Sequence, residues 1–169
     1  MTLTGTDLAR LSTTLGLSAR DLLGATDFYI LNSHESVPEG LHQIPQVNTE
    51  QGPAFVALKK QKDGDCIFLE DNLCMVHAVR PSVCASFPFV FERKGPDLSW
   101  GLSAMKQICP GLGKGPQVQD SDLVSLGTEA LRALALYKEF VEMWNKTTKA
   151  PTALDFIESV LKDQRFSVQ

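Results

Sequence analysis

The sequence contains no run of about 20 apolar residues, the length that a membrane-spanning helix requires. Its opening "MTLTGTDLARLSTTLG" also lacks the basic start, apolar run and small-residue cleavage site of a secretory signal peptide. We therefore expect a cytoplasmic protein with no membrane partner. Because thiols stay reduced in that compartment, none of the three ways of pairing its four cysteines as disulfides is expected.

An excess of basic residues is also missing. The chain carries 16 Lys and Arg against 20 Asp and Glu, which gives a net charge of −4, and its basic residues are scattered. Without a positive field, we expect no nucleic-acid partner and no attraction to anionic lipid. Of its three histidines, His34 and His42 lie in the polar connection 32–53 and are expected to be solvated.

The two ends of the chain have helical patterns. Thr4 and Asp7, and then Ser18 and Asp21, have the spacing of capping boxes, and leucines follow each pair at helical intervals. Gly16 is expected to end the first helix. The segments 120–146 and 152–164 show the same periodicity near the C-terminus.

The middle of the chain indicates strands and turns. Asp63-Gly64 is a hairpin signal, and two strands are expected around the turn 94–97. Phe87, Phe89 and Phe91 alternate as one buried strand face would. We therefore predict one α+β domain over residues 1–169, with a small cysteine-bearing antiparallel β core between N-terminal and C-terminal helices.

No two cysteines have the C-x2-C spacing that makes a zinc site recognisable. The four are Cys66, Cys74, Cys84 and Cys109. A turn at 70–72 is expected to fold the strand of Cys74 back beside that of Cys66, which would bring two sulfurs close together. From the spacing alone, a metal site and a set of buried core cysteines are both open.

The residues beside the cysteines sharpen the metal hypothesis. Pro81 suits the first position of a helix, so we expect Cys84 in the opening turn, where the positive helix end lowers the pKa of a thiol. Arg80 would place a fixed cation beside a cofactor held by thiolates. His77 is expected near the cluster as a surface residue rather than as a ligand. In the loop "CPGLGKG", which begins at Cys109, a turn is favoured over a phosphate cradle.

These residues also resemble a known family, the bacterial YkgJ-like cysteine-cluster proteins. The similarity is carried by Cys66-x-Phe68-Leu69, Cys74-x-x-His77-x-x-Arg80-Pro81-x-x-Cys84-x-x-Phe87-Pro88-Phe89, Cys109-Pro110-Gly111-x-Gly113-x-Gly115 and the opening "LTGTDLARLSTTLGLSARDLL". It covers about residues 2–115, and the C-terminal helical extension 120–164 lies outside it. The resemblance implies a zinc- or iron-chelating domain in which the four cysteines bind the metal.

One feature of that family has no counterpart in this sequence. The family carries a CxxCxxCC-type cluster just upstream of the "LT-x-x-D" helix, whereas Met1 stands immediately before that helix here. Either translation of the native gene begins further upstream, or this member has lost the upstream cysteines. The four cysteines would be an incomplete ligand shell in the first case and a complete tetrathiolate set in the second.

Three functions are therefore open at this point. The first is a metal-binding protein that holds an iron–sulfur cluster, such as 4Fe–4S, or zinc in a structural or redox role. The second is a protein-modifying enzyme, because flagellin lysine methylases resemble the family, although the chain shows no cofactor loop or catalytic constellation. The third is a module for a protein partner, in which Met143 and Trp144 would be exposed on the helix 120–146.

Overall fold

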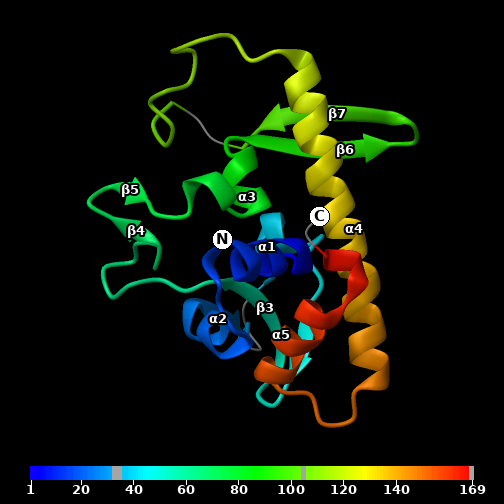
Figure 1. The fold of residues 1–169 in the computed structure, drawn as a ribbon. Coiled ribbons are helices and arrows are strands. Elements are labelled where there is room, and N and C mark those ends of the chain that lie inside the picture. Colours follow the sequence, from blue (N-terminus) through cyan, green and yellow to red (C-terminus); the bar gives the residue numbers. More distant parts are fainter. Residues whose placement is uncertain (32–35, 104–105, 168–169) are drawn as a thin grey trace.

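A computed structural model describes residues 1–31, 36–103 and 106–167 of the chain, apart from the side chain of Glu39. His34, which is predicted to be solvated, lies outside these residues, as do Ala104 and Met105 at the end of the second predicted strand. Helices stand at both ends of the chain and small antiparallel sheets in the middle (Figure 1). The predicted α+β class is confirmed.

Two helices come first, then the strands, which the short helix α3 interrupts, and then two more helices. The helices are α1 (Gly5–Leu15), α2 (Ala19–Ala25), α3 (Ser82–Ser86), α4 (Asp120–Thr147) and α5 (Ala153–Lys162), with 3₁₀ turns η1 (Glu39–Leu41), η2 (His77–Val79) and η3 (Gln164–Phe166). The strands are β1 (Thr26–Tyr29), β2 (Val47–Thr49), β3 (Gly52–Leu58), β4 (Leu69–Glu70), β5 (Leu73–Cys74), β6 (Phe89–Lys94) and β7 (Asp97–Leu102).

The first two helices begin where the local signals predict. Asp7 N donates to Thr4 Oγ1 at 3.3 Å, and Thr4 N donates back to Asp7 Oδ2 at 2.9 Å. Ser18 and Asp21 form the same reciprocal pair at the start of α2. Gly16 ends α1 with a φ of +66°, in the left-handed region that glycine adopts without a steric penalty. The predicted capping boxes and the predicted end of α1 are confirmed.

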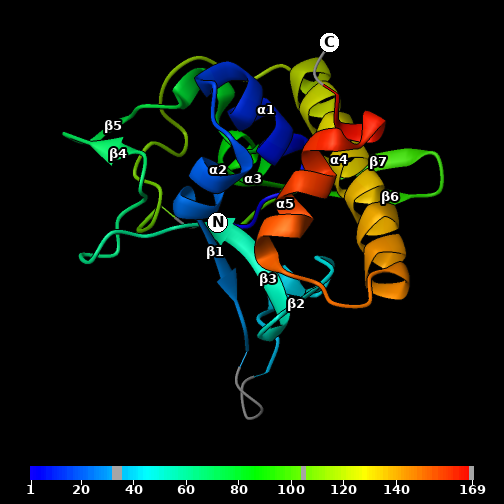
Figure 2. The same ribbon diagram turned by 60° about the horizontal axis from the view of Figure 1, so that its bottom comes forward.

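Strand β3 is the centre of a three-stranded antiparallel sheet with the order β1-β3-β2. Thr26 of β1 pairs with Leu58, and Val47 of β2 pairs with Ala54. In both ribbon views α5 lies between α2 and α4, beside this sheet (Figures 1 and 2). The strands β4 and β5, and likewise β6 and β7, form two separate two-stranded hairpins.

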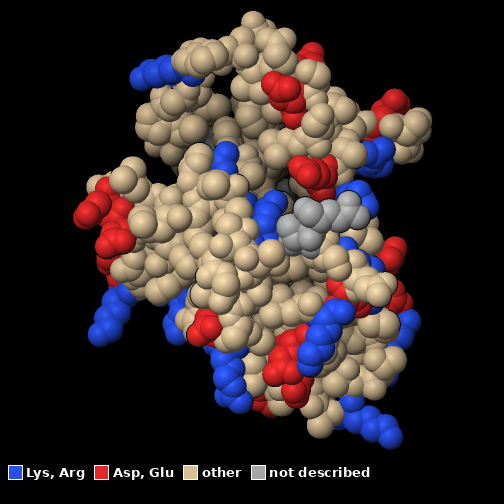
Figure 3. Space-filling view, viewed as in Figure 1, with Lys and Arg blue, Asp and Glu red and all other residues tan. Residues whose placement is uncertain are grey.

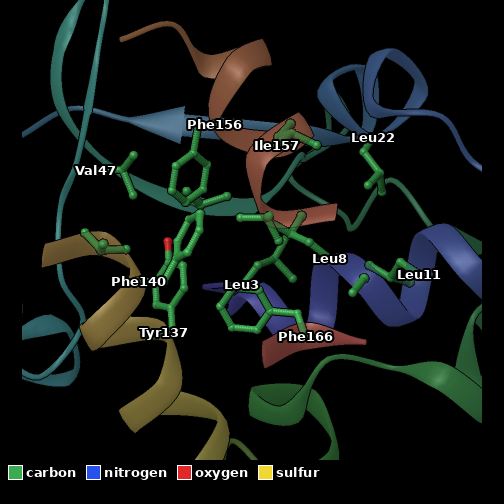
Figure 4. Close-up of a cluster of buried hydrophobic side chains, with 14 of the residues drawn as sticks. Leu3, Leu8, Leu11, Leu22, Val47, Tyr137, Phe140, Phe156, Ile157 and Phe166 are labelled. Carbon is green, nitrogen blue, oxygen red and sulfur yellow. The ribbon is translucent and has the colours of Figure 1, made fainter. Parts of the chain in front are cut away.

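The hydrophobic core lies where α1, α4 and α5 meet the three-stranded sheet (Figure 4). The ring of Phe156 stands at its centre and packs edge-to-face against the rings of Phe28, Tyr137, Phe140 and Trp144. The fully buried aliphatic side chains of the core include Leu3, Leu8, Leu11, Leu22, Val47 and Ile157. The terminal helices therefore supply most of the buried apolar surface that stabilises the fold.

Helix α4 runs from the core to the β6–β7 hairpin and packs against both (Figure 1). Gly127 is buried at the hairpin contact, where a Cβ atom would overlap the ring of Phe91. A glycine inside this helix thus lets the strand approach it closely. Within the described residues, no helix combines the length and the apolar character that crossing a membrane would need.

The β6–β7 hairpin confirms the two predicted strands but changes the position of one aromatic residue. Strand β6 begins at Phe89, and Lys94 pairs with Asp97 across the turn. Phe87 precedes the strand and is 51% exposed. The expectation that Phe87 lies on the same buried face as Phe89 is therefore wrong, because the alternation applies only from the first strand residue onward.

Candidate metal centre

A tight turn after β3 positions Cys66. Gln61 N donates to Asp65 O at 2.7 Å, and Gly64 has a φ of +94° that favours glycine. The turn brings Cys66 back to Lys60, with which it forms an isolated antiparallel bridge. The chain reversal predicted here is confirmed. Cys66 is partly buried and packs against the edge of the hydrophobic core.

The β4–β5 hairpin carries Cys74. Asp71 and Asn72 form its turn with φ values of +47° and +62°, and a type I′ turn requires positive φ at both central residues. The register places Cys74 opposite Leu69. The predicted turn therefore folds the chain of Cys74 back toward Cys66, although Cys66 itself lies three residues before β4 and outside the ladder.

Cys84 lies in the first turn of α3, as predicted, and its N–H donates to Pro81 O at 2.8 Å. The pKa of its thiol is nevertheless raised, first by burial and then by the nearby Cys66. Cys74 acts in the same direction. The expectation of a lowered pKa is therefore wrong, because burial of the thiol disfavours its charged form.

A buried carboxylate fixes the chain just before Cys84. Asp7 is 1% exposed, and its Oδ1 accepts hydrogen bonds from Ser82 N at 2.8 Å and from Ser82 Oγ at 2.9 Å. Arg10 Nη2 donates to Asp7 Oδ1 at 3.0 Å and to Arg80 O at 2.8 Å. We call this set the Asp7 clamp: Asp7, Arg10, Ser82 and the carbonyl of Arg80. The clamp joins α1 to the segment that presents Cys84.

Three of the four cysteines line one cavity of about 210 Å³: Cys66, Cys74 and Cys84. They come from three different places in the fold, namely the bridge after β3, the strand β5 and the helix α3. Met1, His77 and Arg80 line the same cavity. The thiol of Cys84 donates to Met1 Sδ at 3.1 Å. The fold therefore gathers soft sulfur donors from segments that are far apart in the sequence.

The side chains of His77 and Arg80 border this cavity. Both were predicted to lie beside the cysteines. Arg80 Nη1 lies 3.5 Å from His77 Nε2, at the long limit of a hydrogen bond. Arg80 thus stands beside the three thiols, where its guanidinium can offset negative charge on bound thiolates. His77 turns one of its ring nitrogens toward that cation rather than leaving it free for a metal.

The structure does not bring Cys109 to this cavity. Cys109 instead lines a second cavity of about 700 Å³, which lies between the loop 109–118 and the β6–β7 hairpin. Phe89 and Trp100 form part of its wall and pack edge-to-face with their ring centroids 5.6 Å apart. The four predicted ligands therefore divide into a group of three and one separate thiol.

The donor chemistry of the first cavity fits zinc or iron, since thiolate sulfur is a preferred ligand of both metals. The side chains do not yet converge. Among the residues that the structure describes, no three His, Cys, Asp or Glu side chains are close enough to hold one metal ion as they stand. Ligation at the distance of about 2.3 Å from zinc to sulfur would therefore require the cysteine sulfurs to move closer together.

Two residues beside the cysteines have roles that the sequence did not reveal. Asp7 has the pattern of a capping residue, and no local signal shows that it also binds Ser82, 75 residues later. Met1 has no motif at all, although its thioether lies against Cys84. Both contacts arise from tertiary packing, which local sequence patterns do not predict.

Comparison with known proteins bears on the same part of the chain. None of the curated proteins and none of the solved structures is similar to it. One family model matches residues 31–110, and its description is "CxxCxxCC: Putative zinc- or iron-chelating domain". The matched range contains all four cysteines and Arg80. The chain is thus similar, over this range, to a domain family described as chelating zinc or iron, and this similarity supports a metal-binding role.

Proposed function

We propose that this protein binds zinc or an iron–sulfur cluster through cysteine thiolates. One observation carries the proposal: three cysteines from separate segments border a single cavity, and the guanidinium of Arg80 borders it too. Three thiols that line one small cavity form a set of soft sulfur donors, which a thiophilic metal prefers. The family similarity over residues 31–110 supports the same conclusion.

Of the four predicted ligands, we propose the three that line this cavity. Cys66, Cys74 and Cys84 line one cavity, and their sulfur atoms would have to come closer together to bind a common ion. Cys109 would have to leave its own cavity, so it contributes only if the loop 109–118 moves. Arg80 is proposed as the residue that stabilises the negatively charged centre from outside the ligand set.

Metal identity is tested with protein purified without oxygen. A 4Fe–4S cluster would give a brown protein that contains iron and acid-labile sulfide in equal amounts. Zinc would give a colourless protein with one equivalent of the metal and no sulfide. A protein that contains neither metal, also after anaerobic reconstitution with each, would contradict the proposal.

The two alternatives have less support in the structure. A partner-binding module should expose both Met143 and Trp144 on the long helix. Met143 is 43% exposed, but Trp144 is 6% exposed, and its Nε1 donates to Asn48 O at 3.1 Å. Trp144 therefore belongs to the core rather than to a docking face. The methylase-like activity, the YkgJ-like membership and the cytoplasmic location stay predictions from the sequence.

A further inference from the structure

Resting on this proposed function, we infer that residues 69–75, the β4–β5 hairpin with Met75, are a flap that carries Cys74 to the metal. Cys66 and Cys84 stand on elements that the rest of the fold holds in place, whereas the flap is held only near its two ends. Cys74 is then the last of the three thiols to bind a metal and the first to leave it, whatever further donor binds there. Opening and closing of the flap thus regulates how fast the site takes up and releases metal.

The two ends of the flap are anchored in the hydrophobic core. Phe68, which precedes the flap, packs against the cluster of buried apolar residues, and Val76, which follows it, is 4% exposed. Between these anchors, the residues 70–75 are all exposed. Burial of apolar surface therefore holds the ends of the flap but not the part that carries Cys74.

The hydrogen bonds of the flap are equally local. Leu69 N donates to Cys66 O at 2.9 Å. Met75 N donates to Phe68 O, also at 2.9 Å. Gln61, whose Nε2 donates to Leu69 O at 3.0 Å, is eight residues away from its partner. Within the described residues, no hydrogen bond or ion pair joins the flap to a more distant part of the chain.

The other two thiols stand on elements that tertiary contacts hold in place. Cys66 forms the antiparallel bridge to Lys60 and packs against the edge of the core. Cys84 belongs to α3, which the Asp7 clamp joins to α1. Ligation requires the three sulfurs to come closer together, and of the three only Cys74 stands on a segment without such contacts. Movement of the flap is therefore the smallest rearrangement that brings the third thiol to the metal.

The cavity is open on the side of the flap. Leu69 and Cys74 form part of its wall, yet Cys74 is exposed. Its neighbours Leu73 and Met75 lie on the opposite face of the strand, since successive side chains alternate, and they are 68% and 61% exposed. The surface over α3 and β5 is largely uncharged, with acidic atoms at its far edge (Figure 3). Inward movement of the flap would thus cover the thiols without separating an ion pair of the described residues.

Hydrogen exchange of the full-length protein, followed by mass spectrometry, tests the flap. The metal-free protein is compared with protein loaded anaerobically with zinc, or with a reconstituted iron–sulfur cluster if zinc is not retained. If the bond from Cys74 shifts the flap about tenfold toward closure, the amides of 69–75 exchange about tenfold more slowly, and we expect a slowing of at least this size. The turn 94–97 of the other hairpin does not line the cavity and should exchange at the same rate in both samples.

Three variants separate the flap from other causes of slower exchange. Cys74→Ser, with metal in excess, should lose the slowing. Leu73→Ser, whose side chain lies on the other face of the same strand, should keep it. Asn72→Ala removes no thiol, but alanine is less suited than asparagine to the φ of +62° at this position of the turn. We expect this variant to release metal to a chelator faster than the wild type, by up to about tenfold.

Several results would overturn the flap while leaving metal binding intact. They are unchanged exchange of 69–75 on metal binding, an equal slowing of the turn 94–97, wild-type slowing in Cys74→Ser, its loss in Leu73→Ser, and wild-type release of metal from Asn72→Ala. A wild-type protein that takes up neither zinc nor a cluster is a different failure, because it would contradict the proposed function itself.

Discussion

Replacement of Asp7 by alanine should reveal how strongly one buried carboxylate holds the cysteine-bearing segment to the helices. Its two oxygens accept five hydrogen bonds, from Thr4 N, Thr4 Oγ1, Arg10 Nη2, Ser82 N and Ser82 Oγ. The substitution removes the acceptor for all of these donors at once. It also leaves the guanidinium of Arg10, 31% exposed, without its counter-charge.

The size of the effect follows from burial. A lost N-terminal cap costs about 1 kcal/mol, and each hydrogen bond to a charged group contributes about 1.5–3 kcal/mol. These contributions share one carboxylate and do not add up. Breaking a buried, charged hydrogen-bond network by removing one partner costs about 3–5 kcal/mol, and we expect Asp7→Ala to lower the free energy of unfolding by that amount.

The chain offers a matched control. Asp21 closes the same capping box at α2, where its carboxylate accepts from Ser18 N at 2.9 Å and from Ser18 Oγ at 2.6 Å, but it stands in solvent. Asp21→Ala should therefore lower the urea midpoint much less than Asp7→Ala. Metal retention should fall in Asp7→Ala alone, because only Asp7 reaches the start of α3. Equal shifts of the two urea midpoints would refute the reasoning.

Two further predictions concern packing and pH. Gly127→Ala should destabilise the protein by about 1–3 kcal/mol, since the new Cβ overlaps the ring of Phe91. Gly24→Ala, in α2 with open space around it, should stabilise by up to about 1 kcal/mol; thermal unfolding checks both, and the same sign for the two would contradict the packing argument. The hydrogen bond from Arg165 lowers the pKa of Asp163, so this carboxylate stabilises the fold at neutral pH and loses that contribution as the pH falls below about 4. The difference in melting temperature between wild type and Asp163→Asn should accordingly vanish in acid, and a difference that persists there would exclude this origin.

Local signals predicted the parts of this fold whose causes are local. The capping residues Thr4 and Ser18, the glycine that ends α1 and the turn at Asp71-Asn72 each act within a few residues of their own position. Such patterns decide where a helix begins or a strand reverses. The α+β class could therefore be predicted from the sequence, whereas the strands β1 and β2 could not.

The placement of the thiols depends on contacts that no local pattern encodes. Cys84 is positioned through Ser82 and Asp7, which are 75 residues apart, and Cys109 is positioned by a loop packed against β6 and β7. The raised pKa of Cys84 likewise results from burial, which depends on the whole fold. The sequence thus pointed to the four cysteines, but it could not predict that three of them line one cavity and that Cys109 lines another.

The measurement that tests the account most directly is the metal content of four single variants, each purified without oxygen. Cys66→Ser, Cys74→Ser and Cys84→Ser should each retain far less metal per protein than the wild type, because each removes one of the three thiols that border the 210 Å³ cavity. Cys109→Ser, whose thiol lies in the other cavity, should retain as much metal as the wild type. Wild-type metal content in the first three variants, or its loss only in Cys109→Ser, would contradict the claim that this cavity is the metal centre.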